Sequence, residues 1–395
     1  MRKVLIIGAG PVQVAGIKRA RELGFHVIAA DDNPHAPGLP LADQADVGHV
    51  KDVAHLTALA RAERVEGIFS ISVEQAVKTI AAVCHELRLP GLTPQAAENA
   101  TNKHRMRAAW AAAGVPSPVS QACQSLAEIR AAAGLFGFPV VVKPVDSAGS
   151  RGVSFVDHDA QLETAYEQAR VFASGGTVLV EEYMHGVEMS VEAFVVGGRF
   201  WPLALSDKVR TQPPYLLDTT VLFPSEQPTA IQEEAVRIVA RAAEVLGIDN
   251  APIHAEVMVT PKGPMMVELA ARGPGFKVFT EMISWVTGID TVRELIRLSV
   301  GETPQFADPL ARGAVLRFPE IAPGRVRSIS GVEAARAVPG ITDLEIYCRE
   351  GDTVRPLASG GDRVGHIIAM SDTRAVALAA VREAERTLQI ETENS

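Results

Sequence analysis

Cysteine is scarce in this chain, and long apolar runs are absent from it. The 395 residues include three cysteines, Cys84, Cys123 and Cys348, and no two of them form a Cys-x-x-Cys pair. This spacing argues against a disulfide framework and a thiolate zinc site, and it is typical of the reducing cytoplasm. No apolar run approaches the roughly 20 residues that a membrane-spanning helix needs. We therefore expect a globular cytoplasmic protein with no membrane partner.

Basic residues are too few to favour a nucleic-acid partner. The chain has 38 lysines and arginines against 47 acidic residues, which gives a formal net charge of −9. A surface of this charge repels a phosphate backbone. Nucleic acid is therefore not expected as a partner, although a local basic pocket can still hold a small anion.

Two nucleotide-binding motifs are missing or incomplete. No Gly-x-x-x-x-Gly-Lys-Ser/Thr run occurs, so a P-loop is excluded. A glycine pair, Gly8 and Gly10, follows the first apolar segment, but Gln13 stands at the third glycine position and Pro11 removes a backbone donor. We interpret this segment as a structural turn, which disfavours a NAD-dependent oxidoreductase.

The first hundred residues alternate between short apolar segments and segments of helical periodicity. We predict strands near residues 4–7, 27–30 and 67–71, and helices near 12–23, 54–64 and 74–87. Strands separated by helices form parallel sheets with right-handed crossovers. Residues 1–100 are therefore predicted to form an α/β doubly wound domain.

The pattern changes after residue 101. We predict strands at 139–143, 153–156 and 178–181, a helix at 231–246, and two hairpins, 187–196 with 199–205 and 253–259 with 265–270. Antiparallel hairpins flanked by helices indicate an α+β domain. We assign residues 101–308 to it, with a lid subdomain at about 115–180. Residues 309–395, with a closing helix at 374–388, are assigned to a small mixed C-terminal domain.

A loop of small residues, 146–152, follows the strand that ends at Lys143. Small residues such as Ser147, Gly149 and Ser150 let the backbone approach an anion, so that N–H groups can donate to phosphate oxygens. A lysine at the strand end is costly to bury without an anion. A hairpin loop with a lysine that reaches solvent explains the same residues, so this segment alone leaves both interpretations open.

A further apolar strand runs into Glu181-Glu182-Tyr183, and Glu188 follows shortly after it. Adjacent acids are usually solvated and carry no function. At a strand end, however, exposed backbone groups can bind an adenine edge, and Glu188 can accept hydrogen bonds from ribose hydroxyls. The segment by itself is weak support for a nucleotide site.

The second hairpin carries the strongest pattern in the sequence. If its turn is short, Glu256 faces Glu268 across the two strands, and the period of two places His254, Ala270 and Arg272 on the same face. Directly opposed like charges destabilise a sheet, so we expect a bound cation between the two carboxylates. Hard oxygen ligands suit Mg²⁺, which arrives with nucleotide phosphates. A register that differs by one residue would separate the two acids.

Lys208 and the run Gln212-Pro213-Pro214-Tyr215 lie between the first hairpin and the next helix. We predict a loop here. A mobile basic loop that closes over a reacting phosphate and a plain surface loop fit the residues equally well.

Taken in order, these motifs resemble the ATP-grasp superfamily, in the branch with a biotin-carboxylase-like N-terminal domain. The resemblance covers nearly the whole chain and is closest to the ATP-grasp L-amino acid ligases and other carboxylate–amine ligases. It implies ATP as the nucleotide, bound by Lys103, Lys143, Ser147, Gly149, Ser150, Gly152, Glu181, Glu182, Tyr183 and Glu188. It also implies Mg²⁺, with Mn²⁺ as a substitute, at Glu256 and Glu268, and catalytic roles for Arg272 and Lys208.

The resemblance implies a reaction as well. The γ-phosphate of ATP passes to a substrate carboxylate, and an amine then displaces phosphate from the acyl phosphate, so that an amide, ADP and phosphate are released. The expected partners are a small carboxylate and a small amine, both amino-acid-like, held by loops such as 72–75, 215–219 and 273–277. Many members of the superfamily pair, which makes a homodimer one assembly to test.

The sequence departs from the family pattern at one metal-binding position. The family usually shows Glu-x-Asn-x-Arg, and Ala270 stands here in place of the asparagine. We hypothesise that His254, which faces Ala270, or a water replaces the missing amide. Two alternatives to ligase activity stay open: an ATP-dependent carboxylase or formyltransferase on the same scaffold, and a nucleotide-binding protein without turnover.

Overall fold

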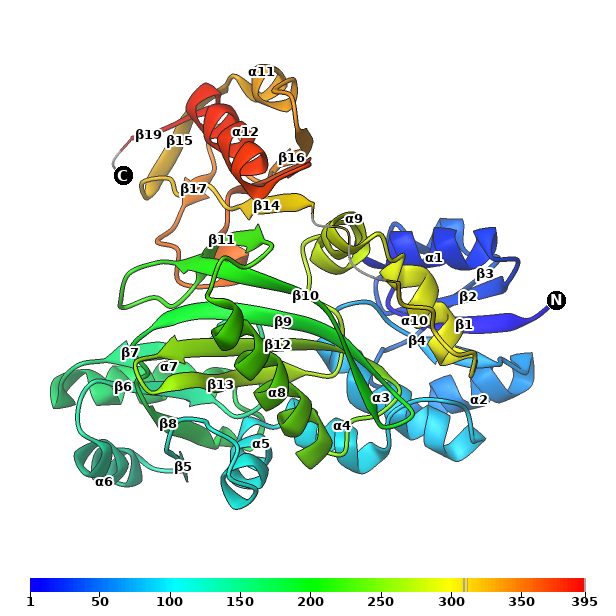
Figure 1. The fold of residues 1–395 in the computed structure, drawn as a ribbon, viewed down its shortest axis with the longest axis horizontal. Helices are drawn as coiled ribbons and strands as arrows, with labels where there is room; N and C mark the ends of the chain where they lie inside the picture. The colour runs from blue at the N-terminus through cyan, green and yellow to red at the C-terminus, as the bar shows by residue number, and fades with distance from the viewer. Residues whose placement is uncertain (308–309, 311, 394–395) are drawn as a thin grey trace.

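The computed structural model describes residues 1–307, 310 and 312–393. From blue to red, Figure 1 shows an N-terminal α/β unit, a lid, a large central sheet and a C-terminal unit. The predicted domain boundary at 308–309 lies outside the described residues. A search of the described helices finds none that is both long enough and apolar enough to span a membrane.

The N-terminal unit is a four-stranded parallel sheet of order β3-β2-β1-β4, as the alternation of strands and helices predicts. Leu5 of β1 packs with Leu56 on one face of the sheet, and Val4 packs with Ile17 on the other. The edge strand β3 is not predicted, because its sequence Gln-Ala-Asp-Val has no apolar run. Its elements are β1 (Lys3–Ile7), α1 (Gln13–Glu22), β2 (His26–Asp31), η1 (Leu39–Leu41), β3 (Gln44–Val47), α2 (Val53–Glu63), β4 (Gly67–Phe69) and α3 (Glu74–Leu87).

The glycine-containing turn after β1 is filled by a side chain of the protein itself. The amide of Gln13 is buried and accepts a hydrogen bond of 2.9 Å from the backbone N–H of Ile71. It also donates to the carbonyl of Ile71. Gln13 therefore ties α1 to the segment after β4, in agreement with the interpretation as a structural turn.

The lid is an antiparallel sheet of order β5-β8-β6-β7 with α6 and α7 packed on one face. The three strands predicted for this region are confirmed, and β5 is an additional edge strand. Two helices, α4 (Pro94–Thr101) and α5 (Lys103–Ala112), connect the N-terminal unit to the lid. The lid elements are β5 (Ser120–Cys123), α6 (Leu126–Phe136), β6 (Val140–Pro144), β7 (Ser154–Val156), η2 (Asp159–Gln161), α7 (Leu162–Phe172), η3 (Ser174–Gly176) and β8 (Val178–Glu182).

The central sheet has eight strands in the order β13-β12-β9-β10-β11-β14-β18-β16. Helix α8 (Thr229–Val245) packs against the β12–β13 end of it. Because β11 pairs with β14, the sheet continues from the lid side into the C-terminal unit. Its strands are β9 (Val187–Val196), β10 (Arg199–Arg210), β11 (Asp218–Phe223), β12 (Ala251–Thr260), β13 (Gly263–Ala270), β14 (Gly313–Arg317), β16 (Ile341–Ile346) and β18 (Gly365–Ser371).

The structure corrects the prediction for the region around Lys208. Strand β10 runs on to Arg210 and is followed by the unpredicted strand β11, so Lys208 lies within the sheet and is buried. The prediction of a loop at Lys208 is wrong, because a run of charged residues is usually solvated and here is not. The loop begins only after Arg210.

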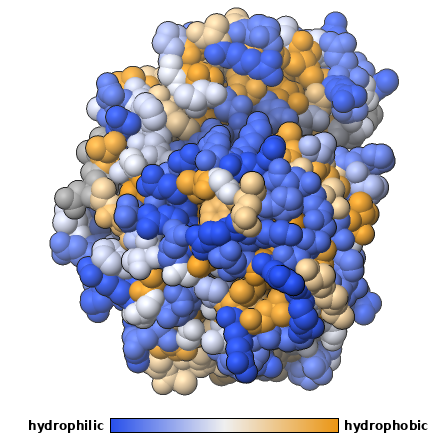
Figure 2. All heavy atoms as spheres, turned by 90° about the vertical axis from the view of Figure 1, so that its right-hand side faces the viewer, coloured by the Kyte–Doolittle hydropathy of each residue, from blue (hydrophilic) through white to orange (hydrophobic). Residues whose placement is uncertain are grey.

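The remaining elements complete the cover of the sheet and the C-terminal unit. A three-stranded sheet of order β17-β15-β19 lies beside α12, and the closing helix is confirmed. Figure 2 shows the face that carries the N-terminal unit, where hydrophilic residues alternate with patches of hydrophobic residues. These elements are η4 (Val278–Met282), α9 (Ile283–Thr287), α10 (Thr291–Ser299), β15 (Gly324–Ser330), α11 (Val332–Arg336), β17 (Thr353–Val354), η5 (Gly360–Asp362), α12 (Arg374–Thr387) and β19 (Gln389–Glu393).

The contact between β14 and the start of α12 gives a test of the fold. A Cβ atom at Gly313 would lie 2.1 Å from the backbone nitrogen of Arg374. Gly313→Ala should lower the free energy of unfolding by about 1–3 kcal/mol, because the backbone must shift to admit the methyl group. Thermal unfolding followed by circular dichroism measures this. Gly134→Ala in α6, where a Cβ meets nothing within 4 Å, is the matched control and should not destabilise.

Candidate active site

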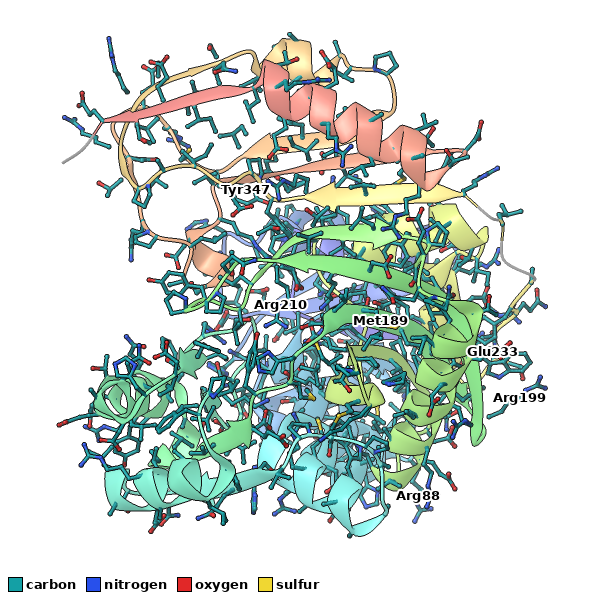
Figure 3. The ribbon with its side chains drawn as sticks, turned by 60° about the vertical axis from the view of Figure 1, so that its left-hand side comes forward. Arg88, Met189, Arg199, Arg210, Glu233 and Tyr347 are labelled. Atoms are coloured by element: carbon teal, nitrogen blue, oxygen red, sulfur yellow. The ribbon has the colours of Figure 1, made fainter. Side chains whose placement is uncertain are left out.

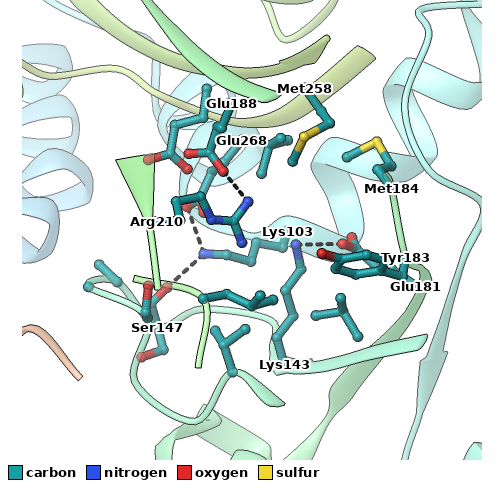
Figure 4. Close-up of a pocket in the computed structure, with 18 of the residues that line it drawn as sticks. Lys103, Lys143, Ser147, Glu181, Tyr183, Met184, Glu188, Arg210, Met258 and Glu268 are labelled. Atoms are coloured by element: carbon teal, nitrogen blue, oxygen red, sulfur yellow. Dashed lines mark hydrogen bonds and ion pairs between the residues drawn. The ribbon is translucent and has the colours of Figure 1, made fainter. Parts of the chain in front are cut away.

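Two adjoining cavities lie along the central sheet, one toward the lid and the other toward the N-terminal and C-terminal units. The smaller one, here named the lid cavity, has a volume of about 120 Å³ and is lined by β6, β8 and the loop 146–152 (Figure 4). The larger one, the inner cavity, has a volume of about 540 Å³. It is lined by residues of the N-terminal unit, the loop 146–152, the central sheet and the C-terminal unit. Both cavities are lined by the stretch 148–151 and by Asp218, Glu256 and Glu268, so their contents can meet there.

Most of the residues predicted to bind nucleotide line the lid cavity. Gly152 is the exception, because a Cβ there would lie 2.9 Å from the Phe172 ring and 3.2 Å from Cα of Ala169 in α7. Its φ of +75° and this close approach to α7 explain the glycine without a nucleotide. The predicted residues that line the lid cavity are Lys103, Lys143, Ser147, Gly149, Ser150, Glu181, Glu182, Tyr183 and Glu188.

Beneath the lid cavity lies a buried group of three charges. Glu181 of β8 accepts from Lys143 of β6 at 2.6 Å and from Arg107 of α5 at 2.7 Å. Burial would raise the pKa of Glu181, but the charges of Arg107 and Lys143 hold it below its usual value. Burial lowers the pKa of Lys143, and the charge of Glu181 opposes this shift. Glu181 therefore stays ionised and anchors both cations at the floor of the cavity.

Lys103 joins the loop 146–152 to strand β13. Its Nζ lies 2.7 Å from a carboxylate oxygen of Glu268 and donates to the carbonyl of Ser147 at 2.6 Å. The side chain starts at the first turn of α5, where Asn102 accepts a hydrogen bond from the backbone N–H of Arg105. The helix cap therefore places this lysine at the junction of the two cavities.

Lys208 is surrounded by three carboxylates. Its Nζ lies 3.0 Å from Glu188, 3.0 Å from Asp218 and 2.5 Å from Glu256, and Arg210 binds the second oxygen of Glu188 at 2.6 Å. Burial would lower the pKa of Lys208, but Asp218, Glu256 and Glu188 raise it well above its usual value. Figure 3 shows Arg210 between the lid and the C-terminal unit. The ammonium group of Lys208 thus lies among three carboxylates, an environment that also suits another cation.

The pairing predicted for the second hairpin is confirmed. Glu256 of β12 is registered with Glu268 of β13, and His254 with Ala270. Both carboxylates line both cavities, so they lie on one side of the sheet. Burial would raise the pKa of Glu256, but the charge of Lys208 and a hydrogen bond from His254 hold it well below its usual value. Two carboxylates therefore face each other at the junction of the cavities, and that of Glu256 is held in its ionised form.

His254, the hypothesised replacement for the missing asparagine, lies between two carboxylates. Its Nδ1 lies 2.8 Å from Glu192, and its Nε2 lies 3.7 Å from Glu256. Burial would lower the pKa of His254, but the charge and hydrogen bond of Glu192 and the hydrogen bond to Glu256 raise it to about 9. A protonated imidazole has no lone pair for a metal ion. In this arrangement the imidazole is a cationic neighbour of Glu256. It must lose its proton to bind a metal ion, and its role as a metal ligand stays a prediction.

Arg272 lies in the inner cavity rather than in the lid cavity. Its Nε donates to Glu74 of the N-terminal unit at 2.6 Å, and its Nη1 donates to the carbonyl of Gly273. Ser72 donates to the carbonyl of Pro274 at 2.5 Å. The loops at 72–75 and 273–277 thus meet at one wall of the inner cavity. Leu217 and Asp218, from the predicted substrate loop 215–219, also line this cavity.

The roof of the inner cavity is held by a network from the C-terminal unit. Lys277, whose φ of +61° is strained for a lysine, binds Asp343 of β16 at 2.7 Å. Asp343 also accepts from His366, whose Nδ1 lies 2.5 Å from the hydroxyl of Tyr347. This network fixes the loop that carries the cavity residue Phe276.

The acid–base balance of this network can be measured. Burial would raise the pKa of Asp343, but hydrogen bonds from His366 and Lys277 lower it to about 2, from 3.8. Because the folded pKa is depressed, the stabilisation is complete above about pH 4 and is lost as the pH falls toward 2. Asp343→Asn should therefore cost about 2 kcal/mol at pH 6 and progressively less below pH 4. Urea unfolding of both proteins across this range tests it, and a cost that does not change with pH would contradict the ion pairs.

Several residues of the site are not found by the sequence prediction. Arg107 lies one helical turn after Lys103, so the spacing of four residues is a local signal that it shares a face with this lysine. Asp218, Glu192 and Arg210 carry no such signal, because only the pairing of β9, β10, β11 and β12 brings them to Lys208 and His254.

Comparison with known proteins agrees with this geometry. Residues 136–281 match the ATP-grasp domain, and residues 317–393 match the L-amino acid ligase C-terminal domain 2. An uncharacterized protein of Sinorhizobium fredii, y4rH, is 27% identical over 384 residues, which cover 94% of this chain and 79% of that protein. The alanine–anticapsin ligase of Bacillus subtilis is 27% identical over 261 residues, which cover 59% of this chain and 55% of that ligase.

Among solved structures, the L-amino acid ligase from Bacillus licheniformis superposes with a TM-score of 0.85 at 22% identity, over 100% of this chain and 99% of that chain. The fold and the site therefore define an ATP-grasp enzyme. More particularly, residues 136–281 form an ATP-grasp domain, and residues 317–393 are of the L-amino acid ligase C-terminal type.

Proposed function

We propose that this protein is an ATP-dependent carboxylate–amine ligase that acts on small amino-acid-like substrates through an acyl phosphate. One observation carries the proposal: Glu256 and Glu268 face each other where the two cavities join. In phosphoryl transfer the attacking and leaving oxygens lie roughly in line, and metal ions neutralise the charge between them. The lid cavity suits the nucleotide, and the inner cavity suits the two substrates.

The nucleotide side of the proposal rests on Lys103, Lys143 and the loop 146–152. Both lysines are buried, and ammonium groups held at the floor of a cavity suit the phosphates of a nucleotide. Glu182 and Tyr183 at the end of β8 form the rim proposed for the adenine ring. Glu188 has both oxygens bound, by Lys208 and Arg210, so its proposed contact with ribose hydroxyls requires one of these cations to move.

The acidic residues fit the divalent cation that this class of enzyme uses. Carboxylate oxygens of Glu188, Asp218 and Glu256 lie within 4.8 Å of one another, and Glu268 is registered with Glu256. Oxygen ligands of this kind suit Mg²⁺, and Mn²⁺ as a substitute. We propose Glu256 and Glu268 as the ligands; when bound there, the cation would neutralise the phosphate charge.

The proposed reaction has two steps. A substrate carboxylate oxygen attacks the γ-phosphorus of ATP, the bond to the β-phosphate oxygen breaks, and ADP and an acyl phosphate result. The amine lone pair then attacks the acyl carbon, phosphate leaves with the bonding electrons, and the nitrogen loses a proton to the departing phosphate as the amide forms. Lys208 and Arg272 are the cations proposed to stabilise the transferred group, because both line the inner cavity beside the two glutamates.

No enzyme nucleophile is needed, and the two buried cysteines are unsuited to the role. Burial raises the pKa of Cys84 to about 12 and of Cys123 to about 11. Both therefore stay thiols at neutral pH, while the nucleophile in covalent catalysis is the thiolate. This supports direct attack by the amine on the acyl phosphate.

Glu268→Gln tests the metal site. The variant keeps the shape of the side chain and removes its charge, so ADP release should fall at least about a hundredfold while the fold stays intact. A coupled ADP assay and thermal unfolding measure the two properties. Glu233→Gln on the exposed face of α8 (Figure 3) is the matched control and should keep full activity. Near-normal turnover of Glu268→Gln would refute the assignment.

Lys143→Ala tests the nucleotide site. Loss of the ammonium group should raise the KM for ATP about tenfold or more, because a charge-assisted contact to the nucleotide is lost. Glu181 keeps Arg107 as a partner, so the variant should still fold. Lys262→Ala in the exposed β12–β13 turn is the control. An unchanged dependence on ATP would remove Lys143 from the pocket.

The alternative functions predict different results in the assays of ADP release and ATP binding. ADP release that bicarbonate or formate stimulates, without dependence on an amine, would favour a carboxylase or formyltransferase. ATP binding without ADP formation across a broad panel of substrates would favour a nucleotide-binding protein. A homodimer and a cytoplasmic location stay predictions.

A further inference from the structure

Arg363, which follows η5 in the C-terminal unit, lies in the wall of the inner cavity. Its guanidinium carbon is 3.5 Å from the ring centroid of Phe318 and 4.8 Å from that of Phe276. One Nη2–H donates to the backbone carbonyl of Asp218 at 2.9 Å. The two rings and this hydrogen bond fix the plane of the guanidinium group in the cavity wall.

The charge of Arg363 has no acidic partner among the described residues. Its Nε is buried and makes no hydrogen bond there, and burial lowers the pKa of the group. The charge of Asp218 opposes that shift, but the carboxylate of Asp218 is itself bound to Lys208 at 3.0 Å. A cation that is removed from water without a counter-ion is costly. Arg363 is only partly exposed, so its charge suits an anion that the described residues do not supply.

The other enclosed cations of the inner cavity are already neutralised. Lys208 has three carboxylate partners, Arg272 binds Glu74, and His254 binds Glu192. Arg151 of the loop 146–152 is exposed to solvent. One enclosed and unpaired guanidinium group suits a single negative charge, and its planar fork matches a carboxylate. A phosphate monoester carries more charge and would need further donors.

We propose that Arg363 binds a carboxylate of the amine substrate that the reaction does not consume, so that this substrate is an amino acid and not a simple amine. The inference rests on the proposed ligase function. The reacting carboxylate belongs beside Glu256 and Glu268, so a second one needs a separate site. Holding it at Arg363 keeps it from the phosphate donor and leaves the amino group free to attack.

Matched pairs of amines test this with the full chain and MgATP. Glycine and L-alanine are each compared with glycinamide and L-alaninamide, with every L-amino acid in turn as the carboxylate donor, and amide products are measured by mass spectrometry. The wild type should prefer each acid over its carboxamide at least about tenfold in kcat/KM. Arg363→Met should lose this preference by slowing the acids only, and Arg363→Lys should keep part of it. Arg355→Met, an exposed arginine of the same unit, is the control.

Equilibrium titration separates this inference from the proposed function, because it needs no turnover. MgADP-loaded protein is titrated with the same pairs and with ethanolamine against O-phosphoethanolamine. Binding of the acids that weakens about tenfold in the carboxamides and in Arg363→Met supports the inference, even if no amide product forms and the ligase proposal falls. Thermal unfolding and the KM for ATP should not change in Arg363→Met.

Three results would overturn the assignment of Arg363. The first is equal use and equal binding of acids and carboxamides by the wild type. The second is an Arg363→Met variant that keeps the wild-type preference, or that loses the same factor with acids and carboxamides, which would indicate a contact with the transferred phosphate. The third is a preference for O-phosphoethanolamine that depends on Arg363, which would assign the site to a phosphate.

Discussion

Buried opposite charges are the constraint on which the active region depends. Lys208 lies within 3.0 Å of Glu188, Asp218 and Glu256, which come from three different strands of the central sheet. A charge that leaves water is tolerated only where partners surround it, so the cluster is stable only when these strands are aligned. Glu181 imposes the same condition between the lid strands and α5, through Lys143 and Arg107. The charges that the proposed chemistry uses are thus also the charges that hold the lid and sheet in register.

The same clusters explain how the site can accept highly charged ligands. Lys103 forms an ion pair with Glu268, and Lys208 forms one with Glu256. Each lysine proposed to bind a phosphate is thus paired with a carboxylate proposed to bind the metal ion. An anionic nucleotide that enters with a divalent cation exchanges both sets of partners at once. The net charge of the site then changes little, and no group is left buried without a counter-ion.

The C-terminal unit contributes residues to the wall of the inner cavity. Strand β14 extends the central sheet by pairing with β11, and the start of β11 supplies Asp218. Phe318 and Arg363 then close the inner cavity from this unit, while Lys277 and Asp343 hold the opposing loop. The walls of one cavity therefore come from segments more than a hundred residues apart, which leaves the choice of substrate to the tertiary packing.

The sequence by itself determines the features that depend on local repeats. The parallel N-terminal sheet follows from alternating strands and helices, and the pairing of Glu256 with Glu268 follows from a short turn and the period of two along a strand. It fails at Lys208, because Ser206-Asp207-Lys208 is indistinguishable from a solvated loop until Glu188, Asp218 and Glu256 surround it. It also cannot find Arg363, whose hydrogen bond to Asp218 joins residues 145 positions apart. Only the tertiary structure decides which charges are buried together, because their partners are neighbours in space and not along the chain.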